Sequence, residues 1–110
     1  MASSAIVCVS KKEYLHPHRF GYGYKETEVL GLLPLAGLML IEPDQFPSWW
    51  RPAIAGRWPD MTIMSLDEVQ DDPDMQEISN EFRVAIEAAN TVAREQGRSD
   101  WVKKLGDPLC

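Results

Sequence analysis

The chain has 110 residues, of which 45% are hydrophobic and 25% charged, and its formal net charge at pH 7 is -6. This length accommodates one domain over residues 1–110, and the composition is that of a globular protein. Because the net negative charge repels the phosphates of DNA and RNA, we expect no nucleic-acid partner.

The cysteines and the apolar segments indicate the compartment. Cys8 and Cys110 lie far apart in the sequence, and neither belongs to a metal-binding pair, so a reducing cytoplasm is expected. The longest apolar run, residues 29–41, is too short to span a bilayer and is interrupted by glycine and proline. We therefore expect a soluble cytoplasmic protein with no membrane partner.

The first third of the chain indicates strands. Residues 4–10, SAIVCVS, form a compact β-branched run that is typical of a buried strand. The alternation of Phe20, Tyr22 and Tyr24 predicts a second strand with one aromatic face.

The middle of the chain is apolar and contains several prolines. Residues 27–33 predict a short helix that ends before Pro34, because a proline inside the helix would remove a hydrogen bond. Residues 36–43 and 61–65 are both interpreted as buried strands.

A long amphipathic helix over residues 73–96 is the clearest pattern in the chain. A short helical turn over residues 66–70 precedes it, where Ser65 and Glu68 match a capping box. For the long helix, Asp72 is the expected N-cap and Gly97 the expected stop. The apolar residues at helical spacing are Met75, Ile78, Phe82, Ala85, Ile86, Ala89, Val92 and Ala93.

The last residues predict a second, short helix. Ser99 or Asp100 would cap it, and Trp101, Val102 and Leu105 would form its apolar side. Strands that precede helices in chain order indicate an α+β domain. We expect a small sheet of about four strands packed against one long C-terminal helix, with a short terminal helix.

Residues 45–60, QFPSWWRPAIAGRWPD, gather large aromatic side chains among three prolines, which predicts a stiff irregular loop. Tryptophan and arginine are enriched at the energetic centres of protein interfaces. The candidate partner-binding residues of this loop are Phe46, Trp49, Trp50, Arg51, Arg57 and Trp58. The alternative is a lid that folds back over the core. Because adjacent Trp49 and Trp50 do not easily point into the same core, we expect one of them to face outward.

An acidic cluster lies between residues 67 and 77, where six carboxylates occur without a basic residue. Helix capping accounts for only one or two of them. The candidate partner-binding members are Asp67, Glu68, Asp71, Asp72 and Asp74. Two interpretations stay open: a solvated face, or a contact for a partner protein with a basic surface.

Residues suited to chemistry are few. His16 and His18 share one side of an extended segment, but two ligands are too few for a zinc site, and Cys8 would have to supply a third. No nucleophile elbow and no phosphate-binding glycine loop occurs. We therefore expect no metal, no cofactor and no enzymatic activity.

Three hypotheses about function are compatible with these patterns. The first is a small acidic cytoplasmic protein-binding module, of the inhibitor, immunity-protein or antitoxin type, that blocks a partner protein. The second is a structural or assembly subunit of a phage or bacterial complex, in which a neighbouring copy in a homo-oligomer covers the aromatic loop. The third is a small enzyme that uses His16, His18 or Cys8.

Overall fold

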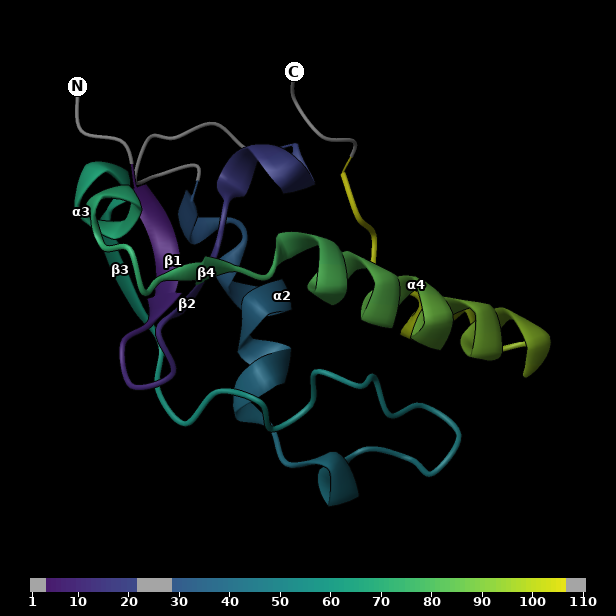
Figure 1. Ribbon diagram of the computed structural model, residues 1–110. Coiled ribbons are helices and arrows are strands. Elements are labelled where there is room, and N and C mark those ends of the chain that lie inside the picture. The colour runs from purple at the N-terminus through teal and green to yellow at the C-terminus, as the bar shows by residue number, and fades with distance from the viewer. Residues whose placement is uncertain (1–3, 22–28, 107–110) are drawn as a thin grey trace.

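The computed structural model describes residues 4–21 and 29–106, which form a four-stranded mixed sheet with helices (Figure 1). The strands are β1 (Ser4–Cys8), β2 (Glu13–Leu15), β3 (Thr62–Ser65) and β4 (Gln76–Glu77), in the order β3-β1-β2-β4. β1 pairs antiparallel with β2 and with β3, whereas β4 runs parallel to β2. The expected α+β class is confirmed, with one long helix in the C-terminal part of the chain.

β1 is an inner strand of the sheet and is buried on both faces. Ile6 and Cys8 contribute to the main core, whereas Ala5 and Val7 contribute to a smaller core under the helix α3 (Leu66–Asp71). Burial on both faces explains why the segment is continuously apolar instead of alternating with polar residues. The prediction of a buried strand here is confirmed.

The second strand lies earlier in the chain than the aromatic alternation predicted. A tight turn in which Lys12 adopts φ +57° returns the chain beside β1, and β2 follows at once. Phe20 ends the 3-10 helix η1 (Pro17–Phe20), so the strand predicted there is wrong at this residue. Tyr22 and Tyr24 lie outside the described residues. The predicted strand at 61–65 is confirmed as β3.

The predicted strand over residues 36–43 is wrong, because the segment is helical. It forms α2 (Leu33–Ala36), η2 (Gly37–Leu40) and η3 (Pro43–Gln45). Pro34 lies in the first turn of α2, where its missing N–H would have no partner anyway. Leu32, Ala36 and Met39 are fully buried at helical spacing. A short apolar run by itself does not distinguish a buried helix from a buried strand.

The long helix α4 (Ser79–Glu95) begins six residues later than predicted. Asp72 does not cap it: the Asp72 carboxylate accepts hydrogen bonds from Lys12 Nζ at 2.7 Å and from the Asp74 backbone N–H at 2.9 Å. Of the intervening residues, Gln76 and Glu77 form β4 instead, and the Ile78 N–H donates to the Tyr14 carbonyl. This pairing depends on β2, a strand that lies far earlier in the chain, which local helical spacing does not reveal.

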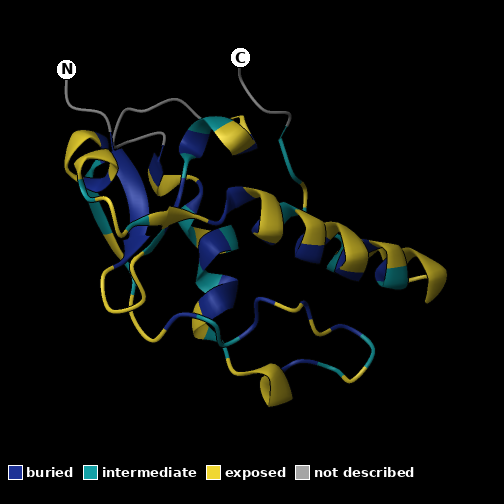
Figure 2. Cartoon of the chain, in the orientation of Figure 1, coloured by how far each residue is buried: buried dark blue, intermediate teal, exposed yellow. Residues whose placement is uncertain are grey.

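The apolar stripe of α4 is confirmed, because its buried positions lie along one side of the helix (Figure 2). Gly97 adopts φ +67° directly after Gln96, the C-cap of α4, and ends the helix as predicted. α4 starts near the sheet and runs away from it (Figure 1). Much of its length therefore lies beyond the strands, where loops and the C-terminal segment complete the core.

The two short helices predicted from the sequence are found in part. α3 occupies the predicted place, although the Ser65 side chain makes no capping hydrogen bond. The C-terminal helix is limited to one 3-10 turn, η4 (Ser99–Trp101), and residues 102–106 continue without regular structure. Gly106 lies against the backbone of Phe20, so closely that a Cβ atom there would overlap the Phe20 carbonyl oxygen.

Candidate functional site

Residues 46–58, called here the tryptophan loop, close one end of the core. Phe46, Trp50 and Trp58 expose only 9%, 0% and 2% of their surfaces. The ring centroids of Phe46 and Trp50 lie 5.3 Å apart. A side chain inside the core offers little surface to a partner, so the burial of these three residues favours the alternative interpretation of a lid, and partner contact by them stays a prediction.

Trp49 and Arg51 face outward from the same loop. Trp49 is partly exposed, and its ring meets Trp101 edge to face at 5.4 Å between centroids. The Arg98 guanidinium lies 5.5 Å from the centre of the Trp49 ring. Arg51 is exposed. The expectation that one of the two adjacent tryptophans faces outward is therefore met by Trp49.

Arg57 ties the tryptophan loop to the sheet and to α4. Its Nη2 and Nε donate to the two carboxylate oxygens of Glu13 at 2.7 and 3.1 Å, and its Nη1 donates to Glu81 at 2.9 Å. Trp58 Nε1 donates to the same Glu13 carboxylate at 2.9 Å. The hydrogen bonds from Arg57 hold the pKa of Glu13 below its usual value. Arg57 thus has a structural role.

A groove runs between the tryptophan loop and one side of α4, and is called here the α4 groove. It consists of two hollows of about 300 and 420 Å³ that share Ala53, Ala85 and Ala88. The helix side is lined mainly by small or apolar residues: Val84, Ala85, Ala88, Ala89 and Val92. The loop side includes Trp49, Arg51, Pro52, Ala53, Ile54 and Arg57.

Val84 lines one of the two hollows of the α4 groove and leaves 57% of its surface exposed. Small side chains such as Ala85 and Ala88 let another chain approach the helix closely. Such a groove is suited to an apolar segment of another protein, which would dock on aliphatic side chains between polar rims. Three predicted residues, Trp49, Arg51 and Arg57, lie along it.

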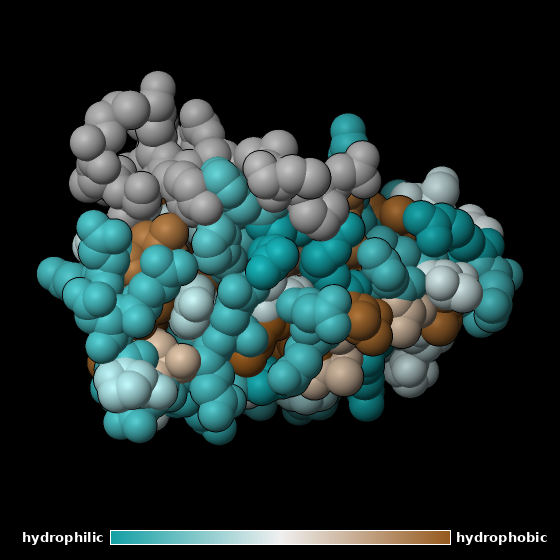
Figure 3. Space-filling view, turned by 45° about the horizontal axis from the view of Figure 1, so that its top comes forward, coloured by the Kyte–Doolittle hydropathy of each residue, from teal (hydrophilic) through white to brown (hydrophobic). Residues whose placement is uncertain are grey.

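The acidic cluster lies elsewhere on the molecule. Asp67, Glu68 and Asp71 are exposed on α3, and Asp74 is exposed just beyond it. The end of the molecule that holds α3 is covered mainly by hydrophilic side chains (Figure 3). Figure 1 places α3 and the tryptophan loop at different ends of the molecule. The structure therefore does not bring the two predicted halves of the partner site together.

Asp72 differs from the rest of the acidic cluster because it is paired. Its carboxylate lies 2.7 Å from Lys12 Nζ, and the hydrogen bond from this lysine lowers the pKa of Asp72. The pairing ties the turn after β1 to the segment before β4. The Asp72 carboxylate is therefore paired with a lysine of the same chain, whereas its acidic neighbours on α3 face solvent.

The histidines and Cys8 are not gathered into one site. The rings of His16 and His18 lie 5.7 Å apart, and burial lowers the pKa of His16. Cys8 pairs with Glu13 in the sheet, whereas His16 follows the opposite end of β2. Three residues of strand, about 10 Å, separate Cys8 from the position opposite His16. Among the described residues, no group of three metal-binding side chains is close enough to hold an ion.

Sequence reasoning missed Val84 and Ala88. A signal for them exists, because Val84, Ala88 and Val92 are apolar at successive spacings of four residues and so share one side of a helix. This row lies beside the buried stripe of the same helix, and the sequence interpretation assigned only the stripe. A second apolar row on an amphipathic helix indicates a surface available for contact.

Comparison of the chain with protein-family models, with curated proteins and with solved structures gives no match. Within the described part of the chain, no helix has both the length and the apolar character needed to cross a membrane.

Proposed function

We propose that this protein is a small acidic protein-binding module of the inhibitor, immunity-protein or antitoxin type, which blocks a partner protein. The observation that carries the proposal is the α4 groove, where Val84 is 57% exposed beside a row of alanines. An exposed aliphatic side chain in a hollow gains free energy when a partner covers it. The proposal is that the groove accepts an apolar segment of the partner.

The loop wall of the groove is held in place before any partner binds. Trp50 and Trp58 anchor the loop in the core, and Arg57 bonds it to Glu13 and Glu81. A wall that is already ordered loses little conformational entropy on binding, which favours affinity. Trp49 and Arg51 on this wall are of the residue types that dominate interface energetics.

The acidic face of α3 has a second role in this proposal. Asp67, Glu68 and Asp71 form no ion pair with any described residue. Carboxylates that are exposed and uncompensated attract a partner with a basic surface over long range. Long-range attraction raises the association rate even when the charges lie away from the contact itself, so separation from the groove is compatible with this role.

Replacing Val84 by glutamine is expected to weaken partner binding by about tenfold, because the apolar contact in the groove is lost. Glutamine is a good helix former and keeps the net charge, so the fold is preserved. The measurement is capture from a lysate of the source organism with the wild-type protein as bait, identification of the retained partner, and then titration of each variant with that partner.

The matched control is Val9→Gln, because Val9 is 48% exposed on the turn after β1, outside the α4 groove. It should bind the partner as the wild type does. Equal binding by a folded Val84→Gln variant would remove the α4 groove from the interface. Equal weakening by both variants would show that replacing any exposed valine by a polar residue weakens binding, which would also contradict the proposal.

Raising the salt concentration is expected to slow association with the partner, since screening shortens the reach of the α3 carboxylates. A variant with Asp67→Asn, Glu68→Gln and Asp71→Asn should associate more slowly at low salt and depend less on salt. Stopped-flow mixing measures both rates. A wild-type rate that does not change with salt would limit the acidic cluster to a solubilising role.

An assembly subunit is the second candidate, and the edge of the sheet favours it. β3 is the last strand on its side, and Thr62–Ser65 contains no charged residue and no proline to discourage pairing with another strand. Two copies would extend the sheet through β3. Light scattering on a sizing column separates the candidates, because a stable oligomer favours assembly and a monomer favours a blocking role.

A further inference from the structure

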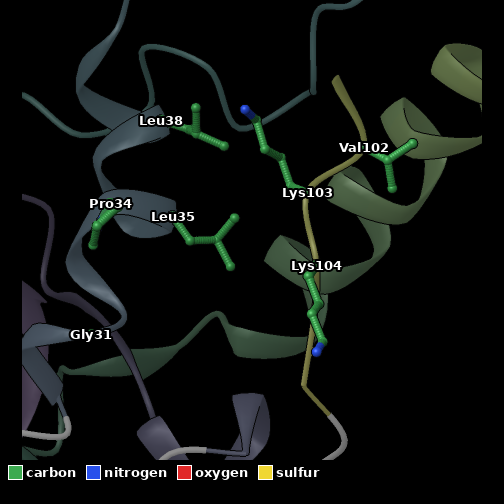
Figure 4. Close-up of a pocket in the computed structure, with 7 residues that line it drawn as sticks. All are labelled: Gly31, Pro34, Leu35, Leu38, Val102, Lys103 and Lys104. Carbon is green, nitrogen blue, oxygen red and sulfur yellow. The ribbon is translucent and has the colours of Figure 1, made fainter. Parts of the chain in front are cut away.

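A hollow separate from the α4 groove lies between α2 and η2 on one side and residues 102–104 on the other (Figure 4). It is called here the C-terminal hollow and has a volume of about 290 Å³. Its lining consists of Gly31, Pro34, Leu35, Leu38, Val102, Lys103 and Lys104. None of these residues lines the α4 groove, so the hollow is a separate site.

The helical wall of the C-terminal hollow is aliphatic. Figure 4 shows that the side chains of Leu35 and Leu38 point toward the C-terminal segment across the gap. Leu38 is buried except for 8% of its surface, and Leu35 is partly exposed. Water in contact with these carbons would be released by an apolar ligand, which favours binding.

The opposite wall supplies positive charge. The Lys103 ammonium lies 5.7 Å from the ring centre of Trp50 and 5.8 Å from that of Trp101, so two indoles hold it in place. In Figure 4 the Lys103 ammonium lies toward Leu38, and the Lys104 ammonium lies toward the other end. Neither lysine forms an ion pair with a carboxylate among the described residues.

The backbone that carries the two lysines is itself fixed. The side chain of Asn90, which is 4% exposed, donates to the Lys103 carbonyl and accepts from the Lys103 N–H, both at 2.8 Å. Arg83 Nη1 donates to the Gly106 carbonyl at 2.6 Å. Because the segment is hydrogen-bonded to α4 at Lys103 and at Gly106, the backbone of the charged wall is already ordered without a ligand.

We propose that the C-terminal hollow binds a small aliphatic monocarboxylate, with its chain on Leu35 and Leu38 and its carboxylate at the Lys103 ammonium. The lining offers ammonium groups as point charges and no arginine fork, which suits a single negative charge. The site goes beyond the proposed protein-binding function and does not depend on it.

The size of the C-terminal hollow favours a small molecule over a protein segment. A water molecule occupies about 30 Å³ of liquid, so 290 Å³ holds on the order of ten non-hydrogen atoms. This volume is at the lower limit of small-molecule sites. A stable protein interface needs an area far larger than seven lining residues supply. Octanoate has the matching size and chemistry and serves as the probe.

Calorimetric titration at constant ionic strength compares octanoate with acetate and with octylammonium. Octanoate is expected to bind at one site and at least about tenfold more tightly than either, because acetate lacks the chain and octylammonium has the wrong charge. Equal binding of octylammonium would reduce the site to an apolar patch and overturn the proposal. Absence of octanoate binding would overturn it as well. Neither comparison requires a variant.

Variants locate the site. Lys103→Met is expected to weaken octanoate binding about tenfold, and Lys11→Met, which removes one exposed charge on the turn after β1, is expected to leave it unchanged. Leu35→Asn should weaken it through the apolar wall. In NMR spectra octanoate should shift the methyl signals of Leu35 and Leu38. Shifts at Val84 instead, or full affinity of folded Lys103→Met, would contradict the assignment.

Discussion

Replacing Trp50 by alanine is expected to lower the free energy of unfolding by about 3–5 kcal/mol, as deletion of a buried aromatic side chain does. Trp50 is fully buried, and its ring packs 5.3 Å from Phe46 and 5.5 Å from Trp101 between centroids. The substitution would also remove one of the two indole rings that contact the Lys103 ammonium. Urea unfolding followed by circular dichroism measures the loss.

The neighbouring tryptophan is the control. Trp49→Ala removes a side chain of the same size that is only partly buried, so its effect on unfolding should be clearly smaller. Together the two variants distinguish the lid from the outward face of the loop. A Trp50→Ala variant as stable as the wild type would contradict the placement of this ring in the core. So would a Trp49→Ala variant that is equally destabilised.

Replacing Arg57 by methionine is expected to lower the free energy of unfolding at neutral pH by about 2–3 kcal/mol. The change keeps most of the side-chain length but removes three hydrogen bonds, two to Glu13 and one to Glu81. It leaves the Glu13 carboxylate, whose side chain is 13% exposed, without its cation. Thermal and urea unfolding provide the measurement.

The pH dependence of stability tests the contact between Arg57 and Glu13, because the direction of the change with pH follows from the lowered pKa of Glu13. Because folding lowers the pKa of Glu13, this contact stabilises the protein above the ordinary pKa of glutamate, and the stabilisation is lost as the pH falls toward the lower, folded pKa. The difference in stability between wild type and Arg57→Met should therefore shrink from about pH 7 down to about pH 3. A difference that stays constant over this range would show that Glu13 charge is not involved.

An exposed ion pair provides the matched comparison for Arg57. Lys12→Met removes the contact with Asp72, in which the lysine side chain is 49% exposed. Solvent screens such pairs, so the loss of stability should be smaller than for Arg57→Met. Equal losses would mean that the Arg57 contacts gain nothing from their partial burial.

Several elements could be predicted because their signals are local. The β-branched run of β1 and the segment of β3 have the composition of strands in any context. The stripe from Phe82 to Ala93 has helical spacing, and Gly97 supplies the left-handed conformation that ends α4. Each of these patterns involves residues within a few turns of one another.

Other elements could not be predicted, because distant residues decide them. The helical turns at residues 33–40 and the predicted strand there use the same apolar residues, and only packing selects between them. Gln76 and Glu77 are in a strand and not in the predicted helix, because they pair with β2. The start of α4 thus depends on a strand formed by residues 13–15.

The candidate site shows the same division. Residue types alone indicated that one of the two adjacent tryptophans of the loop faces outward, but not which one. Trp50 and Trp58 point inward, where Trp101 and Glu13 meet them from distant segments, whereas Trp49 is left at the surface. The separation of the α3 carboxylates from the loop likewise follows from the path of the chain through β3.

By itself the sequence determined the α+β class, the acidic character and the amphipathic helix, because composition and short-range periodicity carry these properties. Only the tertiary structure decided which aromatic rings are buried, and that Val84 and Ala88 border a groove while Leu35 and Leu38 face two lysines. These surfaces arise where segments far apart in the chain meet, and the free energy that selects them comes from contacts between those segments.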